Sequence, residues 1–395
     1  MIEQQLKIEK LVYGGDGLSR GPEGVVLAPF TLPGEIVDLE VGAPEKGVRR
    51  GRVLRIVEPS TDRVTPECEY FGRCGGCHYQ QASYAAQVSA KRAILEETLM
   101  RSGKIAAPGP IEILSAEPWG YRNRVQLHFQ DGRMGFLAAR SKELVEIDHC
   151  PISSPKVNEA IGKLAKMVRD SRWPRFLRTL EVFTNEESVQ INVVETDRPV
   201  AKRFFEWCAE EIRPLEAGAL NYAGFNVSKG SFFQVNRFLV DQLVEEVTGG
   251  PGGGTAVDLY AGVGLFSVPL ARKFKRVIAV ESGTGAVRDL EANAGRIEQT
   301  IEAAKSTVDV FLEGFHEPCE LVVADPPRAG LGKIAVKKLA ALQPSRLTLV
   351  ACDPATLARD LAPLLAAGYG IERLVVVDLF PQTYHIETVV KLVKG

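Results

Sequence analysis

The sequence predicts an α/β protein in which a small β-barrel and a central α+β domain precede a Rossmann-like domain. Three observations support this fold class. From residue 255 onward, apolar strands alternate with helices, as in a parallel sheet covered on both faces. Residues 1–57 contain short strands separated by glycine-rich turns, as in small barrels. The residues between mix both patterns, and 395 residues suffice for three domains.

The composition is that of an ordinary globular protein, with 45% apolar residues, 25% charged residues and a net charge of −2. Any nucleic-acid surface must therefore come from local clustering of basic residues. The first twelve residues lack an apolar segment, which excludes a signal peptide. No apolar run reaches the roughly 20 residues of a membrane helix. We expect a cytoplasmic protein without a membrane partner, whose seven cysteines serve metal binding, catalysis or burial.

The first predicted domain, residues 1–57, has strand-like segments at 6–13, 24–30, 35–41 and 50–58. Its last hairpin is crowded with basic side chains. A charged edge strand that resists aggregation is one interpretation, and a surface that contacts phosphates is the one we favour. These side chains are Lys46, Arg49, Arg50, Arg52 and Arg55.

The central domain, predicted over residues 58–220, alternates helices and strands. The pattern predicts helices at 83–100 and 159–170. It predicts strands at 121–130, 133–140, 143–150, 180–185 and 188–195.

Three cysteines at the start of this domain, Cys68, Cys74 and Cys77, have the spacing of metal ligands. Two glycines between the last two allow the backbone to wrap around a bound centre. Cys150, at the end of a predicted hairpin, supplies a fourth thiol. Four thiolates suit zinc or an iron–sulfur cluster, and unrelated buried thiols are the alternative. The cluster is favoured because the second closely spaced cysteine pair of a zinc ribbon is absent.

The third domain is predicted over residues 221–395, with a parallel sheet. Its expected strands are 255–260, 276–281, 308–313, 321–325, 346–352, 372–380 and 385–394. Ligands of such sheets bind at the carboxyl ends of the strands. This rule gathers the segments DLYAGVG, AVES, ADPPR and ACDP on one rim.

The first of these segments resembles a nucleotide-binding loop, with Gly262 and Gly264 between a strand and a helix. Ser267 replaces the third glycine of a dinucleotide fingerprint, which weakens an NAD interpretation. Glu281, at the end of the next strand, is placed to bind both hydroxyls of a ribose. With Asp258 and Tyr260 beside the loop, S-adenosylmethionine is the favoured ligand. A glycine turn that serves only helix packing is the alternative.

The rim also carries an acid and a thiol. Asp325 is followed by two prolines and then by Arg328, which suits a phosphate or a carbonyl. Cys352 precedes a helix that Asp353 can cap, and a helix amino end favours the thiolate. A buried small hydrophobic residue is the alternative for Cys352.

A thiolate beside a methyl sulfonium has a specific use. Addition of sulfur to carbon 6 of uracil makes carbon 5 nucleophilic, and a base must then remove the proton from carbon 5. Glu387 is the favoured base and His385 the alternative. In the segment 229–236, Phe232 can stack on an extruded base and Gln234 can hold the cofactor or uracil.

Six segments together resemble the RNA uracil-5-methyltransferase family over nearly the whole chain: CEYFGRCGGC, FFQVN, DLYAGVG, DPPRAG, ACDPATLARD and DLFPQTYHIE. The resemblance implies a class I methyltransferase domain behind an OB-like TRAM barrel that binds RNA. It implies Cys352 as the nucleophile and Glu387 as the proton acceptor. A [4Fe–4S] cluster would be held by Cys68, Cys74, Cys77 and Cys150. The cofactor would be lined by Gln234, Tyr260, Gly262, Glu281 and Asp325, and the uridine by Phe232 and Arg328.

Two other functions stay open at this point. A cytosine-5-methyltransferase would use the same thiol but needs an acid to protonate cytosine. An RNA-binding iron–sulfur protein without catalysis is the second, although the intact Cys352 and Glu387 argue against it. By resemblance, ribosomal RNA is favoured over transfer RNA as the substrate, and we expect a monomer.

Overall fold

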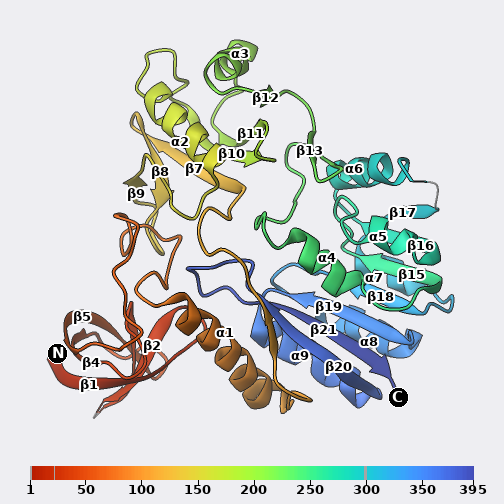
Figure 1. Ribbon diagram of the computed structural model, residues 1–395, viewed down its shortest axis with the longest axis horizontal. Helices are drawn as coiled ribbons and strands as arrows, with labels where there is room; N and C mark the ends of the chain where they lie inside the picture. Colours follow the sequence, from red (N-terminus) through yellow and green to blue (C-terminus); the bar gives the residue numbers. More distant parts are fainter. Residues whose placement is uncertain (1, 22, 298–299) are drawn as a thin grey trace.

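The computed structural model describes residues 2–21, 23–297 and 300–395. Three bodies are visible in Figure 1: a barrel at the N-terminus, a six-stranded sheet in the middle of the chain, and an eight-stranded sheet that ends at the C-terminus. This arrangement confirms the predicted fold class. Among the described residues, no helix is both long and apolar enough to span a bilayer.

The barrel closes in the order β1-β2-β3-β5-β4 around a core that includes the fully buried Ile8, Val26 and Val37. Its strands are β1 (Ile2–Leu11), β2 (Asp16–Gly21), β3 (Gly24–Pro29), β4 (Ile36–Val41) and β5 (Val48–Glu58). Strand β2 was not predicted from the sequence. Its residues, DGLSRG, are mostly polar or glycine, so no apolar alternation marks the strand.

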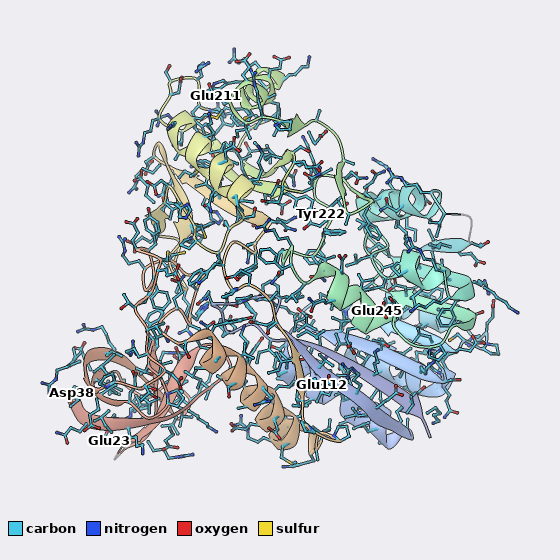
Figure 2. All side chains as sticks on the ribbon, in the orientation of Figure 1. Glu23, Asp38, Glu112, Glu211, Tyr222 and Glu245 are labelled. Atoms are coloured by element: carbon cyan, nitrogen blue, oxygen red, sulfur yellow. The ribbon has the colours of Figure 1, made fainter. Side chains whose placement is uncertain are left out.

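The basic side chains of the barrel are largely paired with its own acids. Arg50 lies 2.8 Å from Asp16, and Arg55 lies 2.9 Å from Asp38. Arg49 is buried and lies 2.9 Å from Glu23, which Figure 2 labels together with Asp38. These pairs fit the interpretation as a charge-protected edge. Contact with RNA phosphates stays a prediction for the exposed members of the set.

The six-stranded sheet has the order β12-β11-β10-β7-β8-β9, and two helices cover it. Phe129, Trp173, Phe204 and Trp207 are the buried large aromatic residues of the core between the sheet and these helices. Its elements are β7 (Arg124–Gln130), β8 (Arg133–Leu137), β9 (Leu144–Glu146), α2 (Pro155–Met167), β10 (Leu177–Thr184), β11 (Val189–Thr196), α3 (Lys202–Glu211) and β12 (Leu215–Glu216). The hairpin of β13 (Leu220–Tyr222) and β14 (Phe225–Val227) leads to the large sheet. Tyr222, labelled in Figure 2, stacks on Phe183 of β10 with ring centroids 5.7 Å apart.

The eight-stranded sheet has the order β17-β16-β15-β18-β19-β21-β20-β6. Its strands are β6 (Glu112–Leu114), β15 (Gly253–Leu259), β16 (Phe274–Glu281), β17 (Ile301–Lys305), β18 (Leu321–Ala324), β19 (Arg346–Ala351), β20 (Tyr369–Val377) and β21 (Glu387–Lys394). The helices between them are α4 (Val240–Thr248), α5 (Ser267–Ala271), α6 (Thr284–Ala294), α7 (Val308–Gly314), α8 (Gly332–Leu342) and α9 (Pro354–Ala366). Residues of α7, α8 and α9 share one apolar core with the sheet, and residues of α4 and α5 share another.

Two predictions about this sheet were wrong. Residues 308–313 form helix α7, in which Val308 and Leu312 are buried at helical spacing while Val310 is 63% exposed. The fifth parallel strand is instead β17, an IEAAK segment that is too short and too polar to predict as a buried strand. The sheet is also not wholly parallel. β21 runs antiparallel to both β19 and β20, between which it is inserted.

Helix α1 (Tyr84–Thr98) joins the large sheet from outside its own domain and anchors the segment that precedes β21. Lys91 is fully buried and donates to Asp378 at 2.6 Å and to the carbonyl of Phe380 at 2.9 Å. The amides of Gln87 and Gln382 bond reciprocally, since Gln87 Nε2 donates to Oε1 of Gln382 and the backbone N–H of Gln382 donates back, both at 2.9 Å. The chain from residue 378 to 386 is therefore fixed before it reaches the rim.

We expect Lys91→Met to lower the free energy of unfolding by about 3–5 kcal/mol, because Asp378 would be left buried without its cation. Denaturant unfolding followed by circular dichroism measures this loss. The matched control is Lys10→Met, which removes an exposed pair with Glu97 and should cost less than about 1 kcal/mol. Equal losses in the two variants would contradict the role assigned to the buried pair.

Candidate active site

The antiparallel insertion of β21 brings Cys352 and Glu387 together. Ala351, the last residue of β19, pairs with Thr388 of β21. Cys352 therefore lies next to Glu387, at the carboxyl end of β19. Asp325 follows β18, the other neighbour of β19, and reaches the same end of the sheet. The sequence predicted Asp325 and Cys352 on one rim of the sheet. The pairing of β19 with β21 brings the carboxylate of Glu387 to the same rim.

The Cys352 thiol is half-buried, and its pKa is raised to about 12. Burial is the largest cause, the carboxyl groups of Glu387 and Asp325 act in the same direction, and Arg328 opposes them. This differs from the predicted thiolate. The first free N–H groups of α9 donate to Asp353 Oδ1, both at 2.9 Å, so the capping carboxylate takes up the positive end of the helix.

The two carboxyl groups of the rim also hold their protons more tightly than usual. Burial raises the pKa of Glu387 well above its ordinary value, and Asp325 adds to the shift. Burial raises the pKa of Asp325 to about 7. Without a cationic ligand, Cys352 therefore favours its neutral form, and both carboxyl groups hold their protons to higher pH than usual. A positively charged ligand at this site would favour ionisation of all three.

The glycine loop after β15 carries Tyr260 and Gly262 of the predicted cofactor site. Tyr260 has φ +62°, a left-handed conformation that is uncommon outside glycine and concentrates at functional sites. The backbone N–H of Gly262 donates to Glu281 Oε2 at 3.0 Å. A Cβ on Gly264 would lie 2.8 Å from Leu290, so a larger residue would push the loop away from α6. Tyr260, Gly262 and Glu281 thus lie together, as predicted from the sequence.

A buried carboxylate lies beneath this loop. Asp258 accepts a hydrogen bond from Ser267 Oγ at 2.5 Å, and burial raises its pKa to about 7. Ser267, which stands in place of the third glycine of a dinucleotide fingerprint, therefore has a structural role. It satisfies one oxygen of an acid that the sheet has buried.

The segment 229–236 connects the pocket to the central domain. Phe232 is 60% exposed, whereas Gln234 is buried. Two serines that precede Phe232 are fixed to α6, because the hydroxyl groups of Ser228 and Ser231 donate to Asp289 at 2.5 Å and 2.6 Å. An exposed aromatic ring on a rigid support is suited to stacking on an unpaired base.

Arg328 and His385 face each other across the rim, with Arg328 Nη2 3.4 Å from His385 Nε2. Burial and the nearby Arg328 lower the pKa of His385 to about 3. His385 is therefore neutral at physiological pH. Its ring lies against Tyr384, with centroids 4.4 Å apart.

A cavity of about 1610 Å³ lies between the barrel, the central domain and this rim. The lining of the cavity includes Phe232, Arg328 and His385. It also includes residues of the barrel and the four cysteines of the predicted metal site. Basic side chains from all three bodies border it, including Arg50 and Arg140. Its size and charge suit a polyanion with at least one unpaired base.

Cys68, Cys74, Cys77 and Cys150 converge at this cavity as free, half-buried thiols. The pKa of Cys77 reflects how close the four thiols are. Burial is the largest cause that raises this pKa to about 12, and the three other thiols raise it further. The N–H of Gly76 donates to Cys74 Sγ at 3.4 Å. Within the described ranges, no three His, Cys, Asp or Glu side chains are close enough to hold one metal ion.

Analysis of the sequence missed several residues near the rim. Tyr13 of the barrel donates to the carbonyl of Cys352, and Lys91 and Gln87 of α1 hold the segment before β21. The only signal for Tyr13 was the Gly-Gly turn behind it. Buried Lys91 had no signal, because a lysine in a helix is ordinarily exposed.

The sheet order, with one antiparallel strand beside the last parallel one, and the glycine loop after β15 define a Rossmann-like class I methyltransferase. The model of the tRNA (uracil-5-)-methyltransferase family matches residues 173–395. The chain belongs to this family and is an S-adenosylmethionine-dependent RNA (uracil-C5) methyltransferase. Its N-terminal barrel is consistent with a TRAM-like domain.

Two relatives and one solved structure illustrate matches over nearly the whole chain. An uncharacterized RNA methyltransferase of Thermotoga maritima is 31% identical, with 99% of both chains covered. The 23S rRNA (uracil(1939)-C(5))-methyltransferase RlmD of Halomonas elongata is 30% identical, with 98% of this chain and 89% of that protein covered. The crystal structure of Pyrococcus abyssi tRNA (uracil-54, C5)-methyltransferase in complex with S-adenosyl-L-homocysteine superposes with a TM-score of 0.74. It is 26% identical and covers 100% of both chains.

Proposed function

We propose that the enzyme methylates carbon 5 of a uridine through a covalent intermediate on Cys352. The Cys352 thiolate adds to carbon 6, and the electron pair of the ring double bond moves toward carbon 5 and the neighbouring carbonyl. Carbon 5 then attacks the methyl group of S-adenosylmethionine, whose carbon–sulfur bond breaks to release S-adenosylhomocysteine. Glu387 takes the proton from carbon 5, the double bond re-forms, and the Cys352 thiolate leaves.

The observation that carries this proposal is the pairing of Ala351 with Thr388. It puts Cys352 and Glu387 side by side although 34 residues lie between them in the sequence, which supports their roles as nucleophile and base. The raised pKa of both groups fits a site that ionises when the sulfonium of the methyl donor is bound. Gln234, Tyr260, Gly262, Glu281 and Asp325 would hold that donor, and Phe232 and Arg328 would contact the uridine.

For the RNA, we propose 23S rRNA as the substrate class and a monomeric enzyme. The support is the relative RlmD of Halomonas elongata, which is matched over almost its full length, and the cavity shared by the barrel and the rim. Cys352, Glu387 and the glycine loop after β15 lie together within one chain, which supports the proposal of a monomer. The Pyrococcus abyssi tRNA (uracil-54, C5)-methyltransferase, whose structure superposes on this chain, makes tRNA the competing substrate.

Transcripts decide between these substrates. Purified enzyme and labelled methyl donor are incubated with 23S rRNA and with total tRNA, both made without modifications, and the product base is mapped. We expect 5-methyluridine at one position of 23S rRNA and at most background labelling of tRNA. Methylated tRNA alone would overturn the rRNA assignment, and 5-methylcytosine in either RNA would overturn the chemistry.

We further propose that Cys68, Cys74, Cys77 and Cys150 hold a [4Fe–4S] cluster. The fit rests on four free thiols at one cavity, on mutual effects on their pKa, and on a backbone N–H that donates to Cys74 sulfur. Such a cluster would supply a redox-capable centre, held by these four thiolates.

Purification without oxygen should therefore yield a brown protein with broad absorption at about 400 nm. Cys77→Ser should lose this band and most of its iron, because it removes one of four ligands. Cys208→Ser, a buried thiol of α3 outside the site, is the matched control and should keep both. A colourless protein with one zinc per chain would refute the cluster.

A further inference from the structure

The turn between β1 and β2 of the barrel reaches the catalytic rim. Gly14 and Gly15 have φ of +108° and +94°, conformations that other residues rarely adopt. A Cβ on Gly15 would lie 3.0 Å from Cβ of His78, the residue after Cys77. Tyr13, immediately before these glycines, is thereby directed into the interface with the methyltransferase domain.

The ring of Tyr13 packs on the segment that leads to β21. It contacts Tyr384 edge-on, with ring centroids 5.5 Å apart and an interplanar angle of 85°. Tyr384 in turn contacts His78 at 4.6 Å. The barrel turn, the cysteine loop and the rim therefore meet in one aromatic cluster, and Tyr13 joins the core that contains α9.

The hydroxyl group of Tyr13 contacts the backbone of the nucleophile. Its Oη donates to the carbonyl oxygen of Cys352 at 3.2 Å. The first turn of helix α9 supplies no free hydrogen-bond donor for this carbonyl. Pro354 has no N–H, and the next two N–H groups donate to the carboxylate of Asp353. The donor for the Cys352 carbonyl thus comes from another domain.

We propose that Tyr13 is a positioning residue for Cys352, so that the barrel takes part in catalysis as well as in RNA binding. This rests on the proposed role of Cys352 as the nucleophile. A thiol at the end of a strand is directed by the orientation of its own peptide unit. A hydrogen bond to that peptide from a rigid barrel narrows the orientations of the sulfur toward carbon 6 of the uracil.

The hydroxyl of Tyr13 remains a donor over the working pH range. Burial raises its pKa above the ordinary value, and the nearby Asp353 acts in the same direction. Tyr13 is therefore neutral and does not exchange protons with the reaction. Its effect is on geometry, which separates it from the acid–base groups of the rim.

The test is Tyr13→Phe in the full-length enzyme, which keeps the ring and removes the hydroxyl. We expect kcat to fall about tenfold, the size of one hydrogen bond of about 1.4 kcal/mol, with KM for RNA unchanged. Adduct formation on 5-fluorouridine RNA should slow by the same factor. Alkylation of Cys352 by iodoacetamide without RNA, followed by peptide mass spectrometry, should become at least about threefold faster, because the thiol is held less firmly.

Tyr369→Phe is the matched control, since it removes a buried hydroxyl that donates to the Pro344 carbonyl at 2.8 Å, at the other end of β20. It should leave kcat and alkylation unchanged. A Tyr13→Phe enzyme with raised KM and normal kcat would assign Tyr13 to RNA binding and overturn the proposal, as would unchanged alkylation of Cys352. If the wild-type enzyme forms no adduct, the nucleophile assignment fails instead, and alkylation still reports on the contact.

Discussion

Replacement of Cys352 by alanine will abolish methylation, with a loss of at least about 10⁴-fold in kcat, because uracil carbon 5 is too weak a nucleophile without the sulfur adduct. Labelled methyl transfer to RNA measures the loss. The variant should still bind S-adenosylmethionine, since the donor loop after β15 does not depend on this thiol. Binding with normal affinity would separate the chemical loss from misfolding.

A second readout identifies the attacking atom. RNA that contains 5-fluorouridine should form a stable cross-link with the wild-type enzyme. Carbon 5 then carries fluorine in place of the proton that the base removes, so the adduct cannot break down. The cross-link should map to Cys352 and be absent from Cys352→Ala. Cys319→Ala makes the same change at a buried thiol before β18, away from the rim, and should keep activity and cross-link. Full methylation by Cys352→Ala would end the covalent mechanism.

Glu387→Gln should separate the two halves of the reaction. Addition of sulfur and methyl transfer need no base on carbon 5, whereas release of the product does. We expect turnover to fall about 10³-fold, with normal RNA accumulating as a methylated adduct on Cys352 that survives denaturing gels. The adduct should carry the labelled methyl group, which distinguishes it from a stalled first step.

His385→Gln is the control for this prediction, because His385 was the alternative base. Its pKa of about 3 leaves it neutral and weakly basic, so the substitution should not trap an adduct. If His385→Gln traps the methylated adduct and Glu387→Gln turns over normally, the base has been assigned to the wrong residue.

The pH profile follows from the same site. Glu387 must be ionised to accept a proton, and its pKa is raised, so the rate should be lost as the pH falls through that raised value. Arg328 lowers the pKa of Glu387, and Arg328→Met should therefore move this acid limb to higher pH. A single-turnover pH–rate profile measures the shift. A limb that moves to lower pH would contradict the electrostatic assignment.

The rim could be predicted from the sequence because local rules set it. Strand ends followed by glycine or proline locate Gly262, Asp325 and Cys352 without knowledge of any contact. The ionisation of Cys352 could not be predicted in this way. The helix amino end was identified, but burial and the carboxyl groups of Glu387 and Asp325, which come from other parts of the sequence, raise the pKa of the thiol.

What escaped prediction depends on contacts distant in the sequence. Lys91 and Asp378 are 287 positions apart, and Tyr13 and Cys352 are 339 apart. Neither pair leaves a periodic pattern. The helix at 308–314 was predicted as a strand because Val310, Phe311 and Leu312 form a short apolar run, and the 63% exposure of Val310 shows that one face of the helix is not covered.

The position of β21 has a consequence for the synthesis of the enzyme. The strand that begins with Glu387 follows β20 in the chain, yet it occupies an interior place between β19 and β20. Until this segment has been synthesised, β19 and β20 have no strand between them and Glu387 is not beside Cys352. The site can therefore form only after β21 has been inserted, and we expect a chain that stops before Glu387 to have no methyltransferase activity.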